Sequence, residues 1–289
     1  MKQNILAPEF LDHFHKKVHE PITAIPTNLP TLNSISRGPG GGIGIKGFIC
    51  VSGNPASGKS ALALGFASAA LNYGIDGGVA MINLEMSAEA TATRMYALHT
   101  NTRIAALEQG NFDDSAFKQA RRSMEGSQPL WVPEGLLTSY DDCLRYMNDC
   151  LVAGCRYYIV DYLQLISTHA NESEIYANTQ RVVTSLRAWG VQNDATIICL
   201  SQFNRTTSSN YEQSPRMTGL FGGMILEASC DLIALLDHSR YERDQNTART
   251  WLIIAKNRHG PTLEIPIEWD YRTLSVREGD PHEEHLWPE

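Results

Sequence analysis

From residue 47 onward, the chain alternates continuous apolar runs with stretches that favour helix. The near-continuous hydrophobicity of the runs is typical of strands buried on both faces of a parallel sheet. The stretch ALALGFASAALNYG predicts a helix over the first strand, closed by Gly74. We therefore predict an α/β fold, a mostly parallel central sheet flanked by helices. The strand candidates are FICVS, GVAMINLE, YYIVDYLQLI, ATIICLSQ, CDLIALLD and TWLIIAKN.

The two ends of the chain differ from this pattern. After Lys256, TLEIPIEW and RTLSV predict an antiparallel C-terminal edge of the sheet, so the main domain should occupy residues 47–277. Residues 278–289 form an acidic tail, and residues 21–46, rich in Pro, Gly, Thr and Asn, predict an irregular linker. Residues 1–20 predict a short helix whose apolar stripe needs a cover; it comprises Leu6, Phe10, Leu11, Phe14 and Val18.

Composition narrows the class of protein. The 289 residues are 43% hydrophobic and 19% charged, as in ordinary soluble domains. No apolar run approaches the roughly 20 residues that span a bilayer, and the polar N-terminus lacks a signal peptide, so we expect an intracellular protein without membrane contact. The net charge of −8 excludes a surface coated with nucleic-acid-binding charge, but not a local basic patch. The six cysteines form no C-x-x-C pair, which predicts buried thiols.

One segment carries a specific chemical motif. GNPASGKS matches G-x-x-x-x-G-K-[ST] at every defined position and follows a predicted strand directly before a predicted helix. In such a loop, backbone amides and the helix N-terminus hold phosphates, lysine bridges the β- and γ-phosphates, and serine ligates Mg²⁺. The alternative is a glycine-rich turn with an incidental lysine. The motif predicts an ATP and Mg²⁺ site at Gly53, Asn54, Pro55, Ala56, Ser57, Gly58, Lys59 and Ser60.

Three polar residues follow other predicted strands and should meet the loop at the same edge of the sheet. Asp161 ends YYIVD and is the candidate for orienting the metal together with Ser60, although acids at strand ends also serve as caps. Glu85 ends GVAMINLE and is the candidate general base, or else a surface glutamate near a helix start. Gln202 ends ATIICLSQ and would contact the γ-phosphate, unless it is a buried strand-end amide.

Several motifs in this order resemble one family. The chain is similar to the RecA-like C-terminal ATPase domain, a P-loop NTPase, of DnaB-type replicative helicases, including phage versions. The resemblance covers residues 27–273 and implies that the family's separate N-terminal domain is absent, with only the helix near residues 6–19 remaining. The matching stretches are TNLPTLNSI, GNPASGKS, INLEMSAE, residues 131–140, YYIVDYLQLI, LSQFNR and KNRHGPT.

The resemblance implies roles for particular residues. Glu85 would be the catalytic base, Gln202 the γ-phosphate sensor, and Lys256 and Arg258 would reach into the neighbouring subunit's ATP site. Such residues imply a ring, usually a homohexamer, in the cytoplasm of a bacterium or phage-infected cell. The helix in residues 1–20 would dock on the adjacent subunit, or else pack on its own domain. A primase or a helicase loader would be a further partner.

The resemblance also implies that two central loops hold single-stranded DNA, here residues 167–176 and 205–223. The first loop has no Lys or Arg, and Phe221 stands in the second where the family has an arginine. DNA contact is therefore expected from side chains and from backbone amides of a glycine-rich segment. The candidates are Arg205, Arg216, Gly222 and Gly223.

Three functions fit these residues. The first is an ATP-dependent DNA helicase of replication, which hydrolyses ATP at subunit interfaces to move along single-stranded DNA. The second is a RecA- or KaiC-like ATPase that assembles on DNA or partners without unwinding. The third is a hydrolysis-poor adaptor that binds a helicase, against which the presence of both Glu85 and Asp161 counts.

Overall fold

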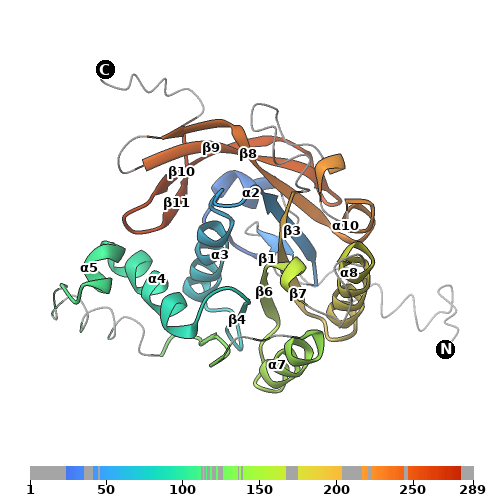
Figure 1. Cartoon of the computed structure of the whole chain (residues 1–289), viewed down its shortest axis with the longest axis horizontal. Coiled ribbons are helices and arrows are strands. Elements are labelled where there is room, and N and C mark those ends of the chain that lie inside the picture. The colour runs from blue at the N-terminus through green and yellow to red at the C-terminus, as the bar shows by residue number, and fades with distance from the viewer. Residues whose placement is uncertain are drawn as a thin grey trace, which may run out of the picture.

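A computed structural model gives the fold of most of the chain (Figure 1). It describes residues 24–35, 42–44, 46–111, 126–135, 137, 139–166, 175–203, 217–220, 223–243 and 247–280, and the isolated residues 113, 115, 118 and 122. In this part a nine-stranded sheet has the order β11-β10-β9-β8-β3-β7-β6-β4-β5. The predicted α/β class, with a mostly parallel sheet and an antiparallel C-terminal edge, is confirmed.

The parallel half of the sheet is built from the predicted apolar runs. It contains β3 (Phe48–Gly53), β4 (Val79–Asn83), β5 (Leu130–Trp131), β6 (Tyr157–Asp161) and β7 (Thr196–Gln202), and β8 joins it beside β3. All residues of β3, β4 and β6 are buried. These strands have no solvent-facing side, which explains why their sequences do not alternate.

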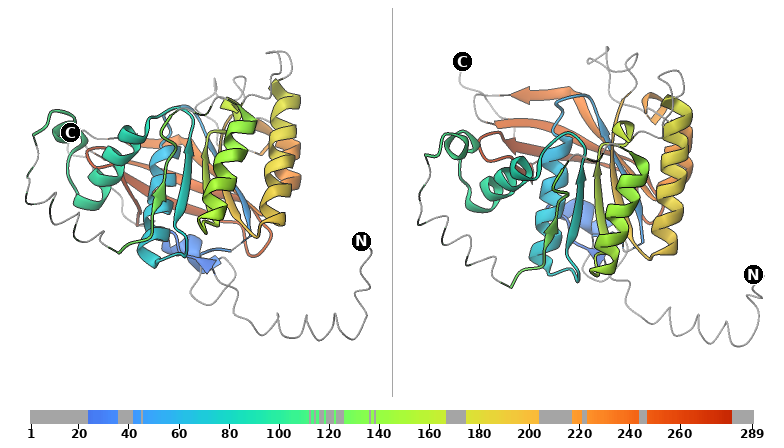
Figure 2. Two further views of the ribbon diagram at one scale, coloured as in Figure 1. Left: turned by 90° about the horizontal axis from the view of Figure 1, so that it is seen from below. Right: turned by 60° about the horizontal axis from the view of Figure 1, so that its bottom comes forward.

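Helices cover both faces of this half (Figure 2). On one face α3 (Lys59–Tyr73) and α4 (Ala88–Thr100) pack on alternate residues of the central strands. On the other face α7 (Tyr140–Val152) and α8 (Ile175–Gln192) lie side by side, with α10 (Gly223–Ser229) beyond them. Gly74 closes α3 in the left-handed conformation, as predicted, and Ser87 caps α4 by accepting a hydrogen bond from Ala90 N.

The antiparallel edge begins one strand earlier than the sequence suggested. β8 (Leu232–Arg243) pairs antiparallel with β9 (Thr247–Asn257), followed by β10 (Glu264–Asp270) and β11 (Ser275–Glu278). Only residues 244–246 separate β8 from β9, whereas a parallel pair needs a crossover of a dozen or more residues. TWLIIAKN is therefore an antiparallel strand, and its residues alternate between buried and partly buried.

The described part of the predicted linker is ordered rather than irregular, so that expectation was wrong there. β1 (Ala24–Ile25) pairs with β2 (Ile43–Gly44), and α2 (Pro30–Ile35) lies between them in sequence. Asn28 Nδ2 donates to Val276 O at 2.8 Å, which ties the segment to β11. Leu29, just before α2, and Leu32, within it, are fully buried in the same apolar core as the side chains of α3.

Shorter elements complete the description. They are α5 (Ile104–Glu108) and the 3-10 turns η1 (Leu163–Leu165) and η3 (Met217–Gly219). The predicted helix in residues 1–20 and residues 281–289 of the predicted tail lie outside the described residues. All six cysteines are buried and unbridged, as predicted.

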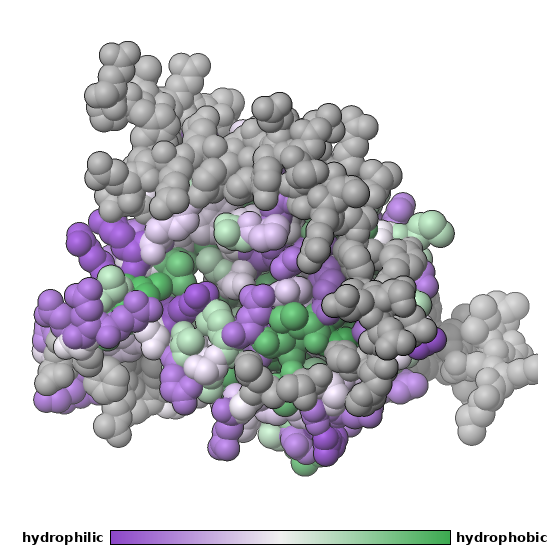
Figure 3. Space-filling model, viewed as in Figure 1, coloured by the Kyte–Doolittle hydropathy of each residue, from purple (hydrophilic) through white to green (hydrophobic). Residues whose placement is uncertain are grey.

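The surface agrees with this division between inside and outside. Among the coloured residues on the face drawn in Figure 3, hydrophilic ones lie along the left and lower margins, and hydrophobic ones form patches nearer the centre. Among the described residues, no helix has the length and apolar content needed to cross a bilayer.

The burial of Leu32 predicts that the segment before residue 47 stabilises the domain. Leu32→Ala removes a side chain that is 1% exposed and should lower the free energy of unfolding by about 2 to 5 kcal/mol. Urea denaturation followed by circular dichroism would measure this. Ser34→Ala, on the exposed side of α2, is the matched control. Equal midpoints for the two variants would contradict a core role for this helix.

Candidate functional site

The phosphate-binding motif forms the turn between β3 and α3. Its two glycines are required by space and backbone conformation. A Cβ on Gly53 would lie 2.5 Å from Ser57 Oγ, and one on Gly58 would lie 2.7 Å from Trp269 Nε1. Gly58 also has a φ of 90°, which side chains disfavour. Trp269 of β10 therefore closes one side of the loop, a contact between the C-terminal edge and the motif that the sequence did not reveal.

Lys59 holds the loop from inside. Its Nζ donates hydrogen bonds to Gly53 O at 3.0 Å and to Asn54 O at 2.7 Å. Burial lowers the pKa of Lys59 to about 8, while the charges of Asp161 and Glu85 act in the opposite direction. A cation that is 7% exposed and faces two carboxylates is suited to an anionic ligand such as phosphate.

Ser60 and Asp161 meet beside the loop. Ser60 Oγ donates to Asp161 Oδ2 at 2.6 Å, across a sheet in which β7 lies between β3 and β6. Burial raises the pKa of Asp161, and the hydrogen bond from Ser60 opposes that rise. Hydroxyl and carboxylate oxygens suit Mg²⁺, which uses few protein ligands and completes its shell with phosphate and water. Among the described residues, no group of three or more His, Cys, Asp or Glu could hold a metal, at this place or at any other.

Glu85 lies just beyond the end of β4, on the same side of the sheet. The Asn83 side chain accepts hydrogen bonds from Glu85 N at 3.1 Å and Met86 N at 3.0 Å, which fixes this turn. Leu84 N donates to Asp161 O at 2.8 Å, so the ends of β4 and β6 are joined. The charge of Glu85 acts on both Lys59 and Asp161. The exposed carboxylate therefore belongs to the same site.

Tyr162 is a site residue that the sequence analysis missed. Burial raises its pKa, as do the charge of Glu85 and a hydrogen bond to that carboxylate, whereas a hydrogen bond with Gln202 lowers it. Gln202 ends β7 and is the register partner of Gly53. Tyr162 thus connects the candidate base with the candidate phosphate contact. Its position directly after Asp161 at a strand end was the available signal.

Lys256 and Arg258 lie at the opposite ends of the strands from the phosphate loop, where β3 and β8 begin. Arg258 Nη1 donates to Asp231 Oδ1 at 3.3 Å, and Lys256 Nζ donates to Glu227 O. Asp231 in turn is hydrogen-bonded to Phe48, the first residue of β3, whereas Lys59 is bonded to Gly53, the last. At about 3.3 Å per residue, β3 separates the two groups by roughly 16 Å. Arg258 and Lys256 are therefore remote from their own chain's phosphate loop.

Of the predicted DNA-contacting residues, only Gly223 is described. It begins α10, and its N donates to Leu220 O at 3.0 Å. Arg205, Arg216 and Gly222 lie outside the described residues, as do residues 167–174 of the first predicted loop. Met224, next to Gly223, is 77% exposed.

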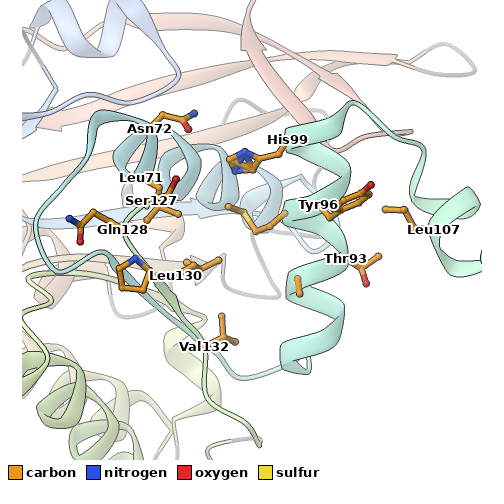
Figure 4. A pocket seen from close by; sticks show the side chains of 13 residues that line it. Leu71, Asn72, Thr93, Tyr96, His99, Leu107, Ser127, Gln128, Leu130 and Val132 are labelled. Atoms are coloured by element: carbon orange, nitrogen blue, oxygen red, sulfur yellow. The ribbon is translucent and has the colours of Figure 1, made fainter. Parts of the chain in front are cut away.

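A separate cavity of about 930 Å³ lies beside the edge strand β5, away from the phosphate loop (Figure 4). Thr93, Tyr96 and His99 of α4 line one side of it. The other side is formed by the end of α3 and by residues 127–132, and Leu107 of α5 contributes at the rim. We call this cavity the α4 groove. Apolar side chains, among them Leu71, Met95, Leu107, Leu130 and Val132, make up much of its wall.

Comparisons with known proteins agree with this architecture. The replicative DNA helicases DnaB of Leifsonia xyli and Geobacillus stearothermophilus are each 26% identical, over 257 and 258 residues. Each alignment covers 85% of this chain and 54% of the relative, so the chain spans about half the length of these curated relatives.

Solved structures share the fold. The ATPase domain of G40P matches with a TM-score of 0.78 at 17% identity, covering 97% of this chain and all of that one. A DnaB-like replicative helicase, described with its interactions with primase, gives 0.74 at 17% identity over 96% of this chain and 67% of that one. The KaiC-like protein PH0186 from Pyrococcus horikoshii gives 0.60 at 16% identity, covering 90% of this chain and all of that one.

The family with the description DnaB-like helicase C-terminal domain matches residues 24–278, which is nearly all of the part that the structure describes. That span contains the phosphate loop, Glu85, Asp161, Gln202 and the KNRHG segment. The chain therefore belongs to the DnaB-like helicase C-terminal domain family.

Proposed function

We propose that this chain is the ATPase of a DNA helicase that acts in replication, hydrolysing ATP between the subunits of a ring to move along single-stranded DNA. One observation carries the proposal. At the end of β3 lie the phosphate loop, Asp161 and Glu85. At its start, Arg258 is hydrogen-bonded to Asp231, and Lys256 is hydrogen-bonded to the backbone of Glu227. Because no single chain brings these groups together, a complete site needs a second copy.

In the proposed mechanism, Lys59 would hold the β- and γ-phosphates of ATP, and Ser60 and Asp161 would hold Mg²⁺. Mg²⁺ neutralises phosphate charge when it is bound. Glu85 accepts the proton of the attacking water, and Gln202 contacts the γ-phosphate. Tyr162 lies within hydrogen-bonding reach of both of these side chains. The neighbour's Arg258 and Lys256 stabilise the charge of the transition state.

The α4 groove supports the ring arrangement. Its apolar wall, formed by α3, α4, α5 and residues 127–132, matches the apolar stripe that the sequence predicts for residues 1–20. An amphipathic helix in an apolar groove is a common mode of association. We assign the groove to residues 1–20 of an adjacent subunit in a homohexamer. Single-stranded DNA would occupy the ring, contacted by Arg205, Arg216, Gly222 and Gly223, and a primase or a helicase loader would bind outside it.

The other two functions have less support. The likeness to a KaiC-like protein concerns the fold alone, at 16% identity. A hydrolysis-poor adaptor would not need Glu85 beside Asp161 and Lys59.

Unwinding of a forked DNA substrate tests the proposal directly. With ATP and Mg²⁺, the wild-type ring should separate the strands, and single-stranded DNA should stimulate its ATPase. Lys59→Ala removes the buried cation and should abolish both activities, whereas Arg145→Ala, at an exposed position on α7, should retain them. A wild-type protein with neither unwinding nor DNA-stimulated ATPase would refute the helicase assignment. Normal turnover by Lys59→Ala would refute the phosphate site.

Completion of the site by a neighbour predicts a specific mixing result. Arg258→Ala should bind ATP normally but hydrolyse it about 10³-fold more slowly. Glu85→Gln should also be inactive, because it lacks the base. Rings mixed from the two variants should regain ATPase activity, since some interfaces combine an intact Glu85 with an intact Arg258. Arg145→Ala, at a 76% exposed position on α7, is the control. No recovery on mixing, with mixed rings verified by mass, would count against this arrangement.

The groove assignment predicts which surface substitutions open the ring. Leu107→Asp in the groove and Phe10→Asp in the predicted helix should each lower the particle mass measured with an ATP analogue, because each places a charge in an apolar contact. Val152→Asp is the matched control, since Val152 is 90% exposed at the end of α7. Intact hexamers of both Leu107→Asp and Phe10→Asp would rule this assignment out.

A further inference from the structure

Asp231 joins several parts of the domain through one residue. It lies just before β8, and its N donates to Phe48 O at 2.7 Å while its Oδ2 accepts from Phe48 N at 2.9 Å. Its own carbonyl accepts from Arg258 N at 2.8 Å. The start of β3, the start of β8 and the segment after β9 therefore meet at this aspartate.

Two arginines share its carboxylate. Arg187 of α8 donates from Nη1 to Oδ2 at 2.6 Å and from Nη2 to Oδ1 at 3.3 Å. Arg258 donates from Nη1 to Oδ1 at 3.3 Å, and from Nη2 to Ala228 O at 2.7 Å. Lys256 lies close enough for the charge of Arg258 to lower its pKa, after the larger effect of burial. Three cations, Arg187, Arg258 and Lys256, therefore lie around Asp231, and the charge of Glu227 also acts on Lys256.

The three side chains of this ion-pair cluster differ in how far they are exposed to solvent. The side chain of Asp231 is 11% exposed and that of Arg187 is 27% exposed, whereas that of Arg258 is 44% exposed. A carboxylate with little contact with water needs cations and N–H donors around it. Arg258 is thus held by three hydrogen bonds. Its backbone N and its Nη1 donate to Asp231, and its Nη2 donates to Ala228 O. The rest of the guanidinium group faces solvent.

We propose that Asp231 is the positioning residue of Arg258. It holds the guanidinium at the subunit surface in the geometry needed to meet the neighbour's γ-phosphate, and Arg187 holds Asp231 in place from α8. This inference rests on the proposed function, because it assumes that Arg258 acts on a neighbouring nucleotide. Without the carboxylate, two guanidinium groups would face each other across the site and repel.

A double-mutant cycle on the full chain tests the inference. ATP turnover is measured at saturating ATP and Mg²⁺ with oligo-dT, and ATP binding is measured separately. Asp231→Asn should lower kcat by about 10²-fold, the loss typical of a misplaced catalytic group, with unchanged ATP affinity. In the Arg258→Ala background it should lower kcat by less than about twofold more, since both changes disable the same group. A purely structural role would make the two losses multiply, which would overturn the inference.

Folding is controlled by a compensating pair. Asp231→Asn combined with Arg187→Gln replaces the more buried ion pair by neutral amides, so that Arg187 leaves no unpaired buried charge, while the half-exposed Arg258 loses its carboxylate partner. This double variant should also lose about 10²-fold in kcat, again because the guanidinium is misplaced; wild-type turnover would refute the inference. Asp194→Asn is the matched control, because Asp194 forms an exposed ion pair with Lys46.

The outcomes separate this inference from the proposed function. Full activity of Arg258→Ala would show that the finger itself is wrong. An inactive Arg258→Ala together with a fully active Asp231→Asn would leave the finger in place and reject only its positioning by Asp231.

Discussion

Strand β3 is bonded along its whole length, and the rest of the structure depends on that pairing. β7 runs parallel to it on one side, with Phe48 opposite Ile197 and Gly53 opposite Gln202, and β8 runs parallel on the other, with Ile49 opposite Leu232. Register in a parallel sheet fixes which residues share an edge. At one edge this places the phosphate loop beside Gln202. At the opposite edge it places Phe48 beside Asp231.

The two ends of β3 differ in how deeply their charged side chains are buried. At the phosphate loop, Lys59 and Asp161 are both almost completely buried and the charge of each acts on the other, so each partly offsets the cost of burying the other. At the opposite edge, Asp231 is buried but its arginine partners are only partly so. The first is suited to enclosing an anion, and the second presents a cation outward.

Local signals in the sequence were sufficient for much of the fold. The apolar runs, Gly74 and the phosphate-loop motif each act through neighbouring residues, and the corresponding strands, helix end and turn are present. The direction of β9 was missed, because the runs CDLIALLD and TWLIIAKN are twelve residues apart in the sequence, long enough for a crossover, whereas the strands themselves extend until only residues 244–246 separate them. The order within residues 24–35 was missed because Leu29 and Leu32 are too few to give a period, and their burial comes from packing in the core that they share with α3.

Contacts between distant residues could not be predicted in the same way. Phe48 and Asp231 are 183 residues apart, and Ser60 and Asp161 are 101 apart. The second pair followed from the known requirement for a carboxylate near the loop, whereas nothing comparable pointed to Asp231, Trp269 or the α4 groove. Each of these depends on how separate segments meet. Tyr162 is intermediate, since its neighbour Asp161 marked the place but not the role.

The separation of the two edges by β3 has a consequence for how copies of the chain associate. If the surface at the end of β3 receives a nucleotide and the surface at its start supplies the cation, the contact between two copies joins two different surfaces. Such a heterologous contact does not end with a pair, because every added copy leaves one receiving edge and one supplying edge unused. Association then stops only when the last copy meets the first, and a small change in the angle between copies would give an open spiral instead of a closed ring.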